Sequence, residues 1–331
     1  MKKYEDSPKI ALIIGVNGQD GLYLSQHLKD RGYRVVGTTR STDRVSANVR
    51  QGIELVSLDI RNSNEIDRIV SKLRPIELYN LAARSSSKQL FDDPVATTEV
   101  NGVSVIRFLE AIRKFSPRTR FCQAASSEIF AGTTISPQDE TTPFRPVNAY
   151  GAAKALAFNI VNAYRLQHGL FACSAILFNH ESPNRSDDFV TRKITRAVAR
   201  IKMGLESTLT VGSLESRRDW GFAGDYVVAM WLMLQQPVAE DFVIATGISH
   251  SVRTFCRVAF ARAGLDYQDF LRVDPNWIAR KEHVELRGNP TKAWERLKWR
   301  PAVDFVELVH RMVDSDIDLL KSQISRTMIM D

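Results

Sequence analysis

Short apolar runs alternate with amphipathic stretches through the first 180 residues, and this alternation constrains the possible folds more than any other feature of the chain. The runs with the length and composition of strands are Ile10–Ile14, Arg34–Thr38, Glu54–Leu58, Ile76–Leu81, Arg120–Ala124 and Phe171–Phe178. The stretches with apolar residues at helical spacing are Gly21–Arg31, Glu65–Leu73, Val103–Lys114 and Tyr150–His168. Strands that alternate with helices predict an α/β fold with a doubly wound parallel sheet, covered by helices on both faces.

Beyond residue 180 the pattern is looser, and no flexible linker marks a boundary between domains. The elements expected there are helices over Val190–Met203, Asp225–Leu234, Val252–Ala263, Pro290–Leu297 and Phe305–Leu319, and strands over Leu209–Val211 and Phe242–Ala245. We therefore expect a second, smaller unit that is built from carboxy-terminal excursions out of the first.

Composition argues against several classes of protein. The 45 basic and 38 acidic residues give a formal charge of +7, but they are interleaved and form no Lys/Arg tract, so we expect no nucleic-acid partner. No apolar run reaches the ~18–20 residues needed to cross a bilayer, so we expect no membrane association. Cys122, Cys173 and Cys256 lack metal-ligand spacing. This favours free thiols that fill the core of a cytoplasmic protein over nucleophiles or metal ligands, and we expect no metal.

Three glycines, Gly15, Gly18 and Gly21, lie in the turn between the first predicted strand and the first predicted helix. Glycine lets the backbone turn tightly and approach a pyrophosphate, which then lies against the free N–H groups of the helix. Because strand, turn and helix follow in the required order, the sequence favours a Rossmann-type dinucleotide site over a purely structural turn. Gln19 and Asp20 belong to the same candidate site.

The end of the second predicted strand indicates which dinucleotide is bound. An acidic residue there usually binds the ribose 2′-hydroxyl of NAD, whereas a basic residue suits the 2′-phosphate of NADP. This chain has Arg40 between hydroxyl side chains and no acid before Asp43, which favours NADP. Asp59 and Ile60, after the third strand, are candidates for contact with the adenine. The alternative for Asp59 is a cap on the next helix.

These observations predict an NADP-binding Rossmann domain over residues 9–178, with returning segments near 218–247 and 302–320. The segments 179–217 and 248–301 are then the smaller carboxy-terminal domain, which we expect to bind the substrate.

Tyr150 and Lys154 lie at positions i and i+4 near the start of a predicted helix, so they share one helix face. A tyrosine acts as a base only after it loses a phenolic proton with a pKa of ~10, and a nearby ammonium lowers that pKa. Ser126 and Glu128 follow the strand that ends near Ala124, at the edge where parallel sheets bind ligands. They either bind and deprotonate a sugar or form a capping pair at a helix start, and the local sequence leaves both open.

Together these motifs resemble the extended short-chain dehydrogenase/reductases. Segments farther along the chain narrow the resemblance to the GDP-mannose 4,6-dehydratases: Phe178–Pro183, Phe189–Lys193, Arg217–Gly221, Ala229–Leu234, Ala245–Gly247 and Gly288–Pro290. The resemblance extends from about Ile10 to Leu319.

The resemblance implies that NADP⁺ oxidises C4 of a GDP-sugar, that water is eliminated across C5 and C6, and that the hydride returns to C6. Tyr150 is then the base for the C4 hydroxyl, and Lys154 lowers its pKa and holds the nicotinamide ribose. Glu128 takes the C5 proton and helps the C6 hydroxyl leave, while Ser126 binds near C4. Glu128 separates this chemistry from simple epimerisation, because the C4 ketone acidifies the C5 proton and a dehydratase needs a carboxylate to remove it.

Further positions are implied by the same resemblance. Those expected to contact the cofactor are Leu81, Ala82, Ala83, Ser85, His180 and Arg185. Those expected around the GDP-sugar are Asn179, Val190, Lys193, Val211, Arg218, Arg280 and Glu282. Asn179 and His180 are alternatively loop hydrogen-bonders and Lys193 a solvated helix charge. The resemblance also implies a homodimer or homotetramer.

The chain departs from the family pattern at several positions. Ser126 stands for a Thr, Phe130 for a Tyr, and Arg84 for a Gln, while Ser41 replaces the second Arg of a pair. The segments Val147–Ala149 and Lys281–Val284 also differ. Most of the changes near the predicted active centre lie where the hexose is expected, so they bear on the identity of the sugar more than on the reaction.

The leading hypothesis is therefore the conversion of GDP-mannose to GDP-4-keto-6-deoxymannose. The alternatives are the same reaction on another GDP-sugar, such as a GDP-manno-heptose, or a GDP-4-keto-sugar reductase or epimerase of the same fold. A catalytically silent NADP-binding regulator, from a different functional class, is expected to lack Tyr150, Lys154 or Glu128, and the chain has all three.

Overall fold

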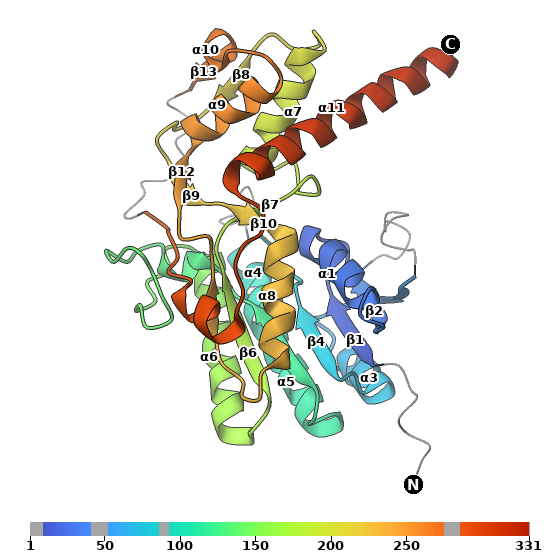
Figure 1. Ribbon diagram of the computed structural model, residues 1–331. Coiled ribbons are helices and arrows are strands. Elements are labelled where there is room, and N and C mark those ends of the chain that lie inside the picture. The colour runs from blue at the N-terminus through green and yellow to red at the C-terminus, as the bar shows by residue number, and fades with distance from the viewer. Residues whose placement is uncertain (1–8, 41–51, 86–92, 275–284, 331) are drawn as a thin grey trace.

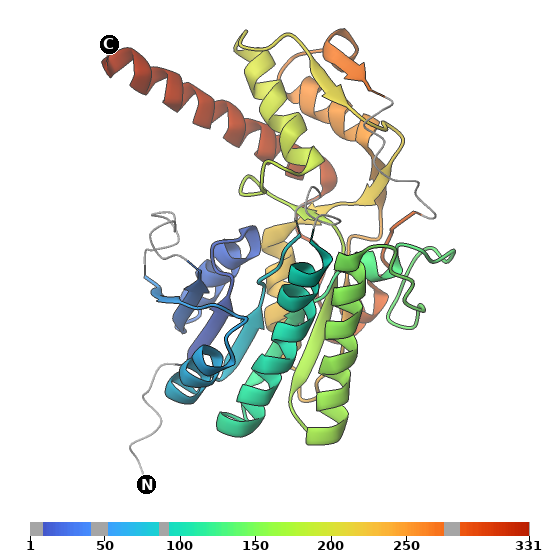
Figure 2. The ribbon, with the colours of Figure 1, turned by 180° about the vertical axis from the view of Figure 1, so that it is seen from behind.

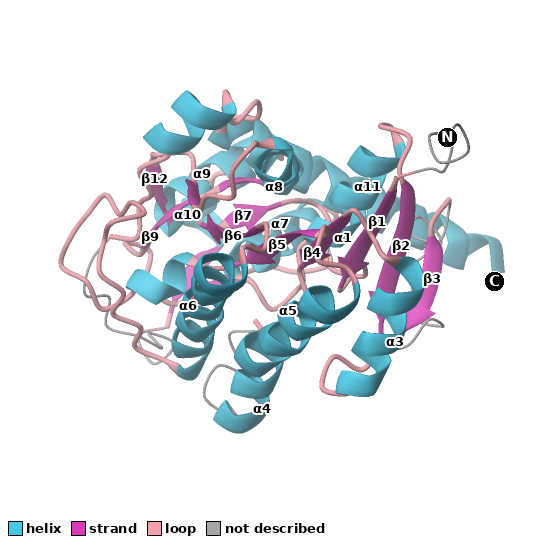
Figure 3. Cartoon of the chain, turned by 90° about the horizontal axis from the view of Figure 1, so that it is seen from below, coloured by secondary structure: helices cyan, strands magenta, loops and turns pink. Residues whose placement is uncertain are grey.

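The computed structural model describes residues 9–40, 52–85, 93–274 and 285–330, and for residues 326–330 only the backbone. Its central sheet has seven strands in the order β11-β6-β5-β4-β1-β2-β3, all parallel to their neighbours (Figure 3). Their bounds are β1 Ile10–Ile14, β2 Arg34–Thr39, β3 Glu54–Ser57, β4 Glu77–Asn80, β5 Arg120–Ala124, β6 Ala172–Leu177 and β11 Phe242–Ile244. This confirms the predicted doubly wound sheet. The order reverses between β1 and β4, the place where such sheets bind ligands.

Helices cover both faces of the sheet, as predicted. On one face lie α1 (Gln19–Lys29) and α8 (Ala223–Gln235) (Figure 1). On the other lie α3 (Ser63–Leu73), α5 (Ser104–Phe115) and α6 (Ala149–His168) (Figure 2).

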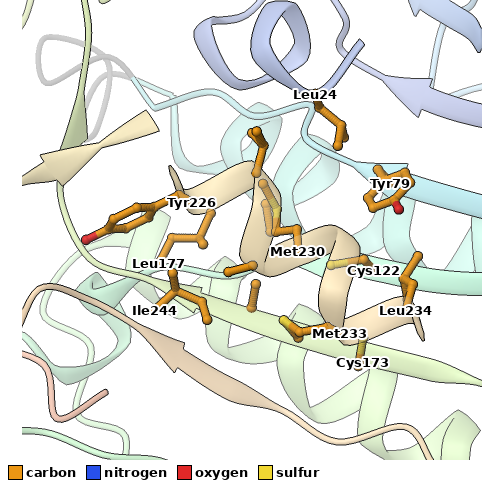
Figure 4. Packing of buried hydrophobic residues seen from close by; sticks show 14 of the residues in the cluster. Leu24, Tyr79, Cys122, Cys173, Leu177, Tyr226, Met230, Met233, Leu234 and Ile244 are labelled. Atoms are coloured by element: carbon orange, nitrogen blue, oxygen red, sulfur yellow. The ribbon is translucent and has the colours of Figure 1, made fainter. Parts of the chain in front are cut away.

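Side chains that alternate along each strand point into two different clusters. Ala11 and Ile13 of β1 pack with α1 and α8, whereas Leu12 and Ile14 pack with α3, α5 and α6. Figure 4 shows part of the first cluster, in which Met230 and Met233 of α8 lie against strands β5 and β6. The three cysteines are buried free thiols, which confirms the prediction that they fill the core.

A third cluster lies beyond the carboxyl ends of the strands. It is formed by α7 (Val190–Lys202), α9 (Val252–Arg262), β8 (Leu209–Val211) and the first part of α11 (Phe305–Met330). Figure 1 shows the remainder of α11 extending away from this cluster, well past the predicted end of the helix at Leu319.

Two segments pack differently from the predicted domain division. Buried apolar residues between positions 293 and 299 pack in the first cluster, with α1, α8 and the sheet. Those between positions 303 and 313 pack in the third cluster, with α7 and α9. Helical periodicity shows which face of a helix is apolar but not which partner it will meet, so the sequence could not show this packing. The division into two domains as a whole stays a prediction.

Several short elements were not predicted. They are α4 (Pro94–Thr98), the π-helical segment η3 (Glu99–Val103), β7 (His180–Glu181), β9 (Arg217–Asp219), β10 (Gly221–Phe222), β12 (Ser249–Ser251), α10 (Tyr267–Phe270) and β13 (Leu271–Val273). Strands of two or three residues are too short to show a period of two in the sequence. Among the described residues, no helix combines the length and apolar character that a membrane span requires.

A buried carboxylate holds the amino-terminal end of β4 in the core. Glu77 is 3% exposed and accepts hydrogen bonds from the hydroxyls of Tyr33 at 2.8 Å and Tyr79 at 2.7 Å. The side-chain amide of Gln235, on α8, also donates to this carboxylate, at 3.0 Å. The network therefore ties β4 to the helix that covers it.

Replacing this carboxylate should destabilise the fold. Glu77→Ala leaves two phenols without their acceptor inside the protein, and we expect the free energy of unfolding to fall by about 2–4 kcal/mol. Urea unfolding measures the change. Glu54→Ala is the control, because Glu54 pairs with Arg34 at the surface and should cost less than about 1 kcal/mol. Equal losses for the two variants would refute a structural role for the buried network.

Candidate active site

The turn after β1 lies against the end of β4, at the point where the strand order reverses. Gly15 has φ +83°, a backbone conformation that favours glycine. A Cβ on Gly15 would also lie 2.9 Å from the backbone of Ala82, so there is no room for a side chain. A Cβ on Gly21 would lie 2.4 Å from the carbonyl oxygen of Val16. The strand–turn–helix arrangement is therefore the one the sequence predicted, and glycine is required at both positions.

The amino terminus of α1 faces outwards from this turn without a side-chain cap. Gly18 occupies the cap position and, having no side chain, offers no side-chain acceptor to the first N–H groups of the helix. The side chain of Gln19 is turned instead to the segment after β6: its amide donates to the carbonyl of His180 at 3.0 Å and accepts from Ser182 at 2.7 Å. An uncapped helix start beside a glycine turn fits the pyrophosphate of a dinucleotide.

Asp20 and His180 form an ion pair between α1 and the segment after β6. His180 Nε2 lies 3.0 Å from the Asp20 carboxylate, and Nδ1 lies 2.8 Å from the carbonyl oxygen of Phe178. Because both partners are acceptors, the ring satisfies both contacts only as an imidazolium. Burial alone lowers the pKa of His180, but the charge of Asp20 outweighs it and the pKa is raised. At Asp20, burial alone raises the pKa of the carboxyl. The charge and hydrogen bond of His180 outweigh burial, so that pKa is lowered.

Tyr226 of α8 packs against the His180 side of this pair. Its ring stacks on His180 with centroids 4.8 Å apart. A Cβ on Gly221 would lie 2.4 Å from the Tyr226 ring, so the adjacent strand β10 approaches closely only because it carries a glycine there. Neither Tyr226 nor Gly221 was singled out from the sequence as a supporting residue.

Ser126 and Glu128 lie at the carboxyl end of β5, on the short 3-10 helix η4 (Ser127–Phe130). Ser126 caps this turn by accepting from the backbone N–H of Glu128 at 3.3 Å, and its role towards a sugar stays a prediction. The side chain of Glu128 does not complete a capping box. It accepts instead from the amide of Asn148 at 2.9 Å, which brings it to the start of α6 and towards Tyr150.

Lys154 lies one turn beyond Tyr150 and is 2% exposed. Its ammonium donates to the carbonyl of Ala124 at 2.6 Å and lies 5.7 Å from the centroid of the Tyr150 ring. Burial lowers the pKa of Lys154 to about 8, although the charge of Asp20 works in the opposite direction. The predicted pair is therefore present on one helix face, beside the end of β5.

The pKa of Tyr150 is raised rather than lowered, and the effect of Lys154 on it stays a prediction. The pKa of Tyr150 is raised to about 12, mainly by burial and also by the negative charge of Glu128, while a hydrogen bond with Ser126 opposes the rise. The Lys154 ammonium is directed to the Ala124 carbonyl rather than to the phenolic oxygen, so desolvation of the phenolate dominates. Tyr150 is consequently a neutral phenol at physiological pH.

The remaining cofactor candidates lie around this centre. Leu81 follows β4 and donates its N–H to the carbonyl of Ile14, with Ala82, Ala83 and Ser85 next in the chain. Arg185 lies with Nε 3.2 Å from the buried carboxylate of Glu181. Its guanidinium also stacks over Phe189 at 3.4 Å, so its orientation is fixed.

Arg40 and Asp59 lie at the carboxyl ends of β2 and β3. Arg40 is exposed, and Ser57 donates to its carbonyl at 3.3 Å. Asp59 does not cap the next helix, because Asn62 does so by accepting from the N–H groups of two residues in its first turn. Asp59 binds Arg61 through both carboxylate oxygens, which lowers its pKa to about 2. Ile60 is half-buried beside it.

The substrate candidates are spread over the segments beyond the strand ends. Val190 and the exposed Lys193 lie in the first turn of α7. Val211 is buried in β8, where it contributes to the third cluster, so it can act only through its backbone or by shaping the site. Arg218 of β9 donates to the carbonyl of Arg217. Asn179 accepts at its backbone carbonyl from Gly221. Arg280 and Glu282 lie outside the described residues.

Asp219 is a buried residue of this region that the sequence did not single out. It is fully buried and accepts from the backbone N–H groups of Thr246, Gly247 and Gly288. Burial raises its pKa to about 6 although these bonds oppose the shift. Its position within the Arg217–Gly221 motif was the only signal in the sequence. It ties β9 to the loop after β11.

Comparison with known proteins is consistent with this architecture. The profile of the GDP-mannose 4,6 dehydratase family matches residues 12–312. GDP-mannose 4,6 dehydratase 2 of Arabidopsis thaliana is 45% identical, over 95% of this chain and 88% of its own. GDP-mannose 4,6 dehydratase of Homo sapiens is 40% identical, over 95% of this chain and 92% of its own. Among solved structures, UDP-glucose 4-epimerase of Thermus thermophilus in complex with NAD matches with a TM-score of 0.82 and 25% identity, covering 93% of this chain and 98% of that one.

The Asp20–His180 pair makes stability depend on pH. Since the pKa of His180 is raised, the pair stabilises the fold fully below the ordinary histidine pKa of about 6.5, and that stability is lost as the pH rises through the raised value. Asp20→Asn should therefore reduce the loss in free energy of unfolding between about pH 6 and about pH 9. Urea unfolding at both pH values measures it. Asp187→Asn, at an exposed carboxylate, is the control. An unchanged pH dependence in Asp20→Asn would contradict the pairing.

Proposed function

The chain belongs to the GDP-mannose 4,6-dehydratase family, and we propose that it converts GDP-mannose to GDP-4-keto-6-deoxymannose with a bound nicotinamide dinucleotide. The observation that carries the proposal is the meeting of Glu128 with Tyr150. A carboxylate from the end of β5 reaches the start of α6, and its charge acts on the phenol. A simple oxidoreductase needs the phenol and the lysine, whereas a dehydratase also needs a carboxylate to remove the proton at C5.

The cofactor site is supported by the shape of the turn after β1. Gly15 at positive φ and the uncapped start of α1 suit a pyrophosphate, and Asp20, Gln19 and His180 hold the turn in place from the other side. A nicotinamide dinucleotide held by these residues would supply the hydride acceptor for C4 of the sugar and the hydride donor for C6.

Tyr150 and Ser126 are the groups we assign to the C4 hydroxyl. With a pKa of about 12 the phenol holds its proton at neutral pH, so it must lose that proton more easily in the working complex than in the protein alone. Lys154 is a cation 5.7 Å from the ring and is charged below its pKa of about 8. Turned from the Ala124 carbonyl towards the phenol, it would stabilise the phenolate.

Glu128 is assigned to the elimination. A ketone at C4 makes the proton on C5 acidic because its removal gives an enolate, and a carboxylate is a sufficient base for that step. The same residue can then protonate the departing C6 hydroxyl. The hydrogen bond from Asn148 restricts the orientation of this carboxylate before substrate binds.

The roles assigned to Tyr150 and Glu128 predict that their variants stop the reaction at different steps of the same assay. Wild-type protein with GDP-mannose and NADP⁺ should form a base-sensitive keto sugar with no net reduced cofactor. Glu128→Gln should oxidise C4 but stall before elimination, so that reduced cofactor accumulates in a single turnover. Tyr150→Phe should bind the cofactor but form almost no keto sugar and almost no reduced cofactor. Its turnover should fall by about 10²–10⁴-fold.

Absorbance of the reduced cofactor and chromatography of the sugar nucleotide report the two steps separately. Substantial keto-deoxy product from Glu128→Gln would remove Glu128 from the role of base. Consumption of NADPH on a keto sugar by the wild type, without dehydration of GDP-mannose, would instead identify a reductase. If another GDP-sugar is dehydrated and GDP-mannose is not, only the identity of the sugar changes.

We also propose that the cofactor is NADP rather than NAD. Arg40 is the first residue after β2 and is exposed, and its charge adds to the contacts of Arg61 in lowering the pKa of Asp59 at the end of the next strand. A guanidinium forms charge-assisted bonds with a phosphate but gains little from a bare ribose.

Arg40→Ala should therefore weaken NADP⁺ binding by about tenfold or more and leave NAD⁺ binding within about twofold. Calorimetric titration with each dinucleotide measures the two affinities. Arg34→Ala, at the opposite end of the same strand, is the matched control and should affect neither. Equal weakening of both dinucleotides by Arg40→Ala would show that Arg40 does not read the 2′-phosphate.

A further inference from the structure

Asn148 joins the helix of Tyr150 to the turn of Glu128 through its side chain. It is the N-cap residue of α6, two positions before Tyr150, and is 8% exposed. Its Oδ1 accepts from the backbone N–H of Gly151 at 2.7 Å. Its Nδ2 donates to Glu128 Oε2 at 2.9 Å. One carboxamide therefore fixes the start of α6 and the carboxylate of Glu128 at the same time.

The backbone around this contact is held rigidly. A Cβ on Gly151 would lie 2.6 Å from the carbonyl oxygen of Glu128, so the first turn of α6 is packed directly on the backbone of η4. One turn later, Lys154 donates to the carbonyl of Ala124 at the end of β5. These two contacts fix the backbones relative to each other, but neither of them acts on the side chain of Glu128. Asn148 does.

The chemistry of the carboxamide makes this double role specific. Asparagine presents an acceptor and a donor on separate atoms, so it caps a helix and donates to a carboxylate together. Aspartate caps a helix equally well but would set a second negative oxygen against Glu128 Oε2. Serine caps with a single oxygen on a shorter side chain and does not extend to the Nδ2 position.

We propose that Asn148 is a positioning residue for the elimination step. It orients the Glu128 carboxylate relative to Tyr150, so that the base is set before the C5 proton becomes acidic. This inference rests on the proposed function, because it assigns Asn148 to one step of that reaction. Asn148 touches neither the sugar nor the cofactor in this account, and it acts through Glu128.

The consequence is a selective defect. Loss of the Nδ2 donor should slow elimination and leave C4 oxidation nearly unchanged, because the cap on α6 still holds Tyr150 and Lys154. A purely structural role predicts instead that both steps decline together. The ratio of the two rates therefore separates a positioning role from a structural one.

The experiment compares Asn148→Asp and Asn148→Ser with the wild type in single turnovers on GDP-mannose and NADP⁺. We expect Asn148→Asp to lower the rate of keto-deoxy sugar formation by about tenfold or more, with reduced cofactor accumulating and its rate of formation within about threefold of wild type. Asn148→Ser should show the same pattern with a smaller effect. The matched control is Asn159→Asp, the same chemical change at an exposed position of the same helix, whose amide donates only to the Ala155 carbonyl, at 2.9 Å. It should leave both rates unchanged.

Thermal unfolding of each variant checks that α6 is intact. If Asn148→Asp does not fold, Asn148→Ser decides the question. Unchanged elimination, or a proportional loss of oxidation and elimination, in the folded variant would overturn the proposal. A wild-type protein that binds both ligands and forms no keto-deoxy sugar would overturn the proposed function, and this inference with it. Normal wild-type turnover without a selective Asn148 defect would overturn only the role of Asn148.

Discussion

The contact between the start of α6 and the turn after β5 is the constraint on which the candidate site depends. Gly151 lets the helix approach the backbone of Glu128 so closely that any side chain there would collide with its carbonyl. That approach puts Tyr150, Lys154, Ser126 and Glu128 within one small region, although they come from two separate elements. Burial raises the pKa of Tyr150, the charge of Glu128 adds to the rise, and the Ser126 hydroxyl opposes it. Gly151 therefore permits the close packing of α6 on the turn that carries Glu128.

A second set of contacts sets the cofactor turn against this centre. The His180 imidazolium pairs with Asp20 at the start of α1 and stacks on Tyr226 of α8, so three segments far apart in the sequence are fixed together. Asp20 also acts electrostatically on both Tyr150 and Lys154. The charges of the dinucleotide turn and of the candidate catalytic residues are therefore coupled, and changes in one should be felt by the other.

Much of the fold was predictable because its signals are local. The apolar runs of β1, β2, β5 and β6 and the glycines between β1 and α1 fixed the parallel sheet and its ligand edge. The spacing of Tyr150 and Lys154 placed both on one helix face. What the sequence did not reveal depends on distant partners: the raised pKa of Tyr150, and the packing of the first part of α11 with α7 and α9 rather than on the sheet.

Asn148 shows the same limit at the level of one side chain. In the sequence it is only a residue in a segment that differs from the family pattern. Its importance comes from Glu128, twenty positions earlier, which lies within 2.9 Å only after β5 and α6 have packed. The homodimer or homotetramer, the substrate positions around Asn179 and Arg218, and the cytoplasmic location stay predictions.

The central claim is that one protein-bound hydride moves from C4 to C6 of a single sugar while the carboxylate of Glu128 handles the proton at C5. Conversion of GDP-mannose carrying deuterium at C4 tests it most directly, with the position of the label read by NMR of the product. We expect deuterium at C6 of the keto-deoxy sugar, with no net change in the cofactor. Keto-deoxy sugar without deuterium at C6, with the label released into the free cofactor pool, would contradict it.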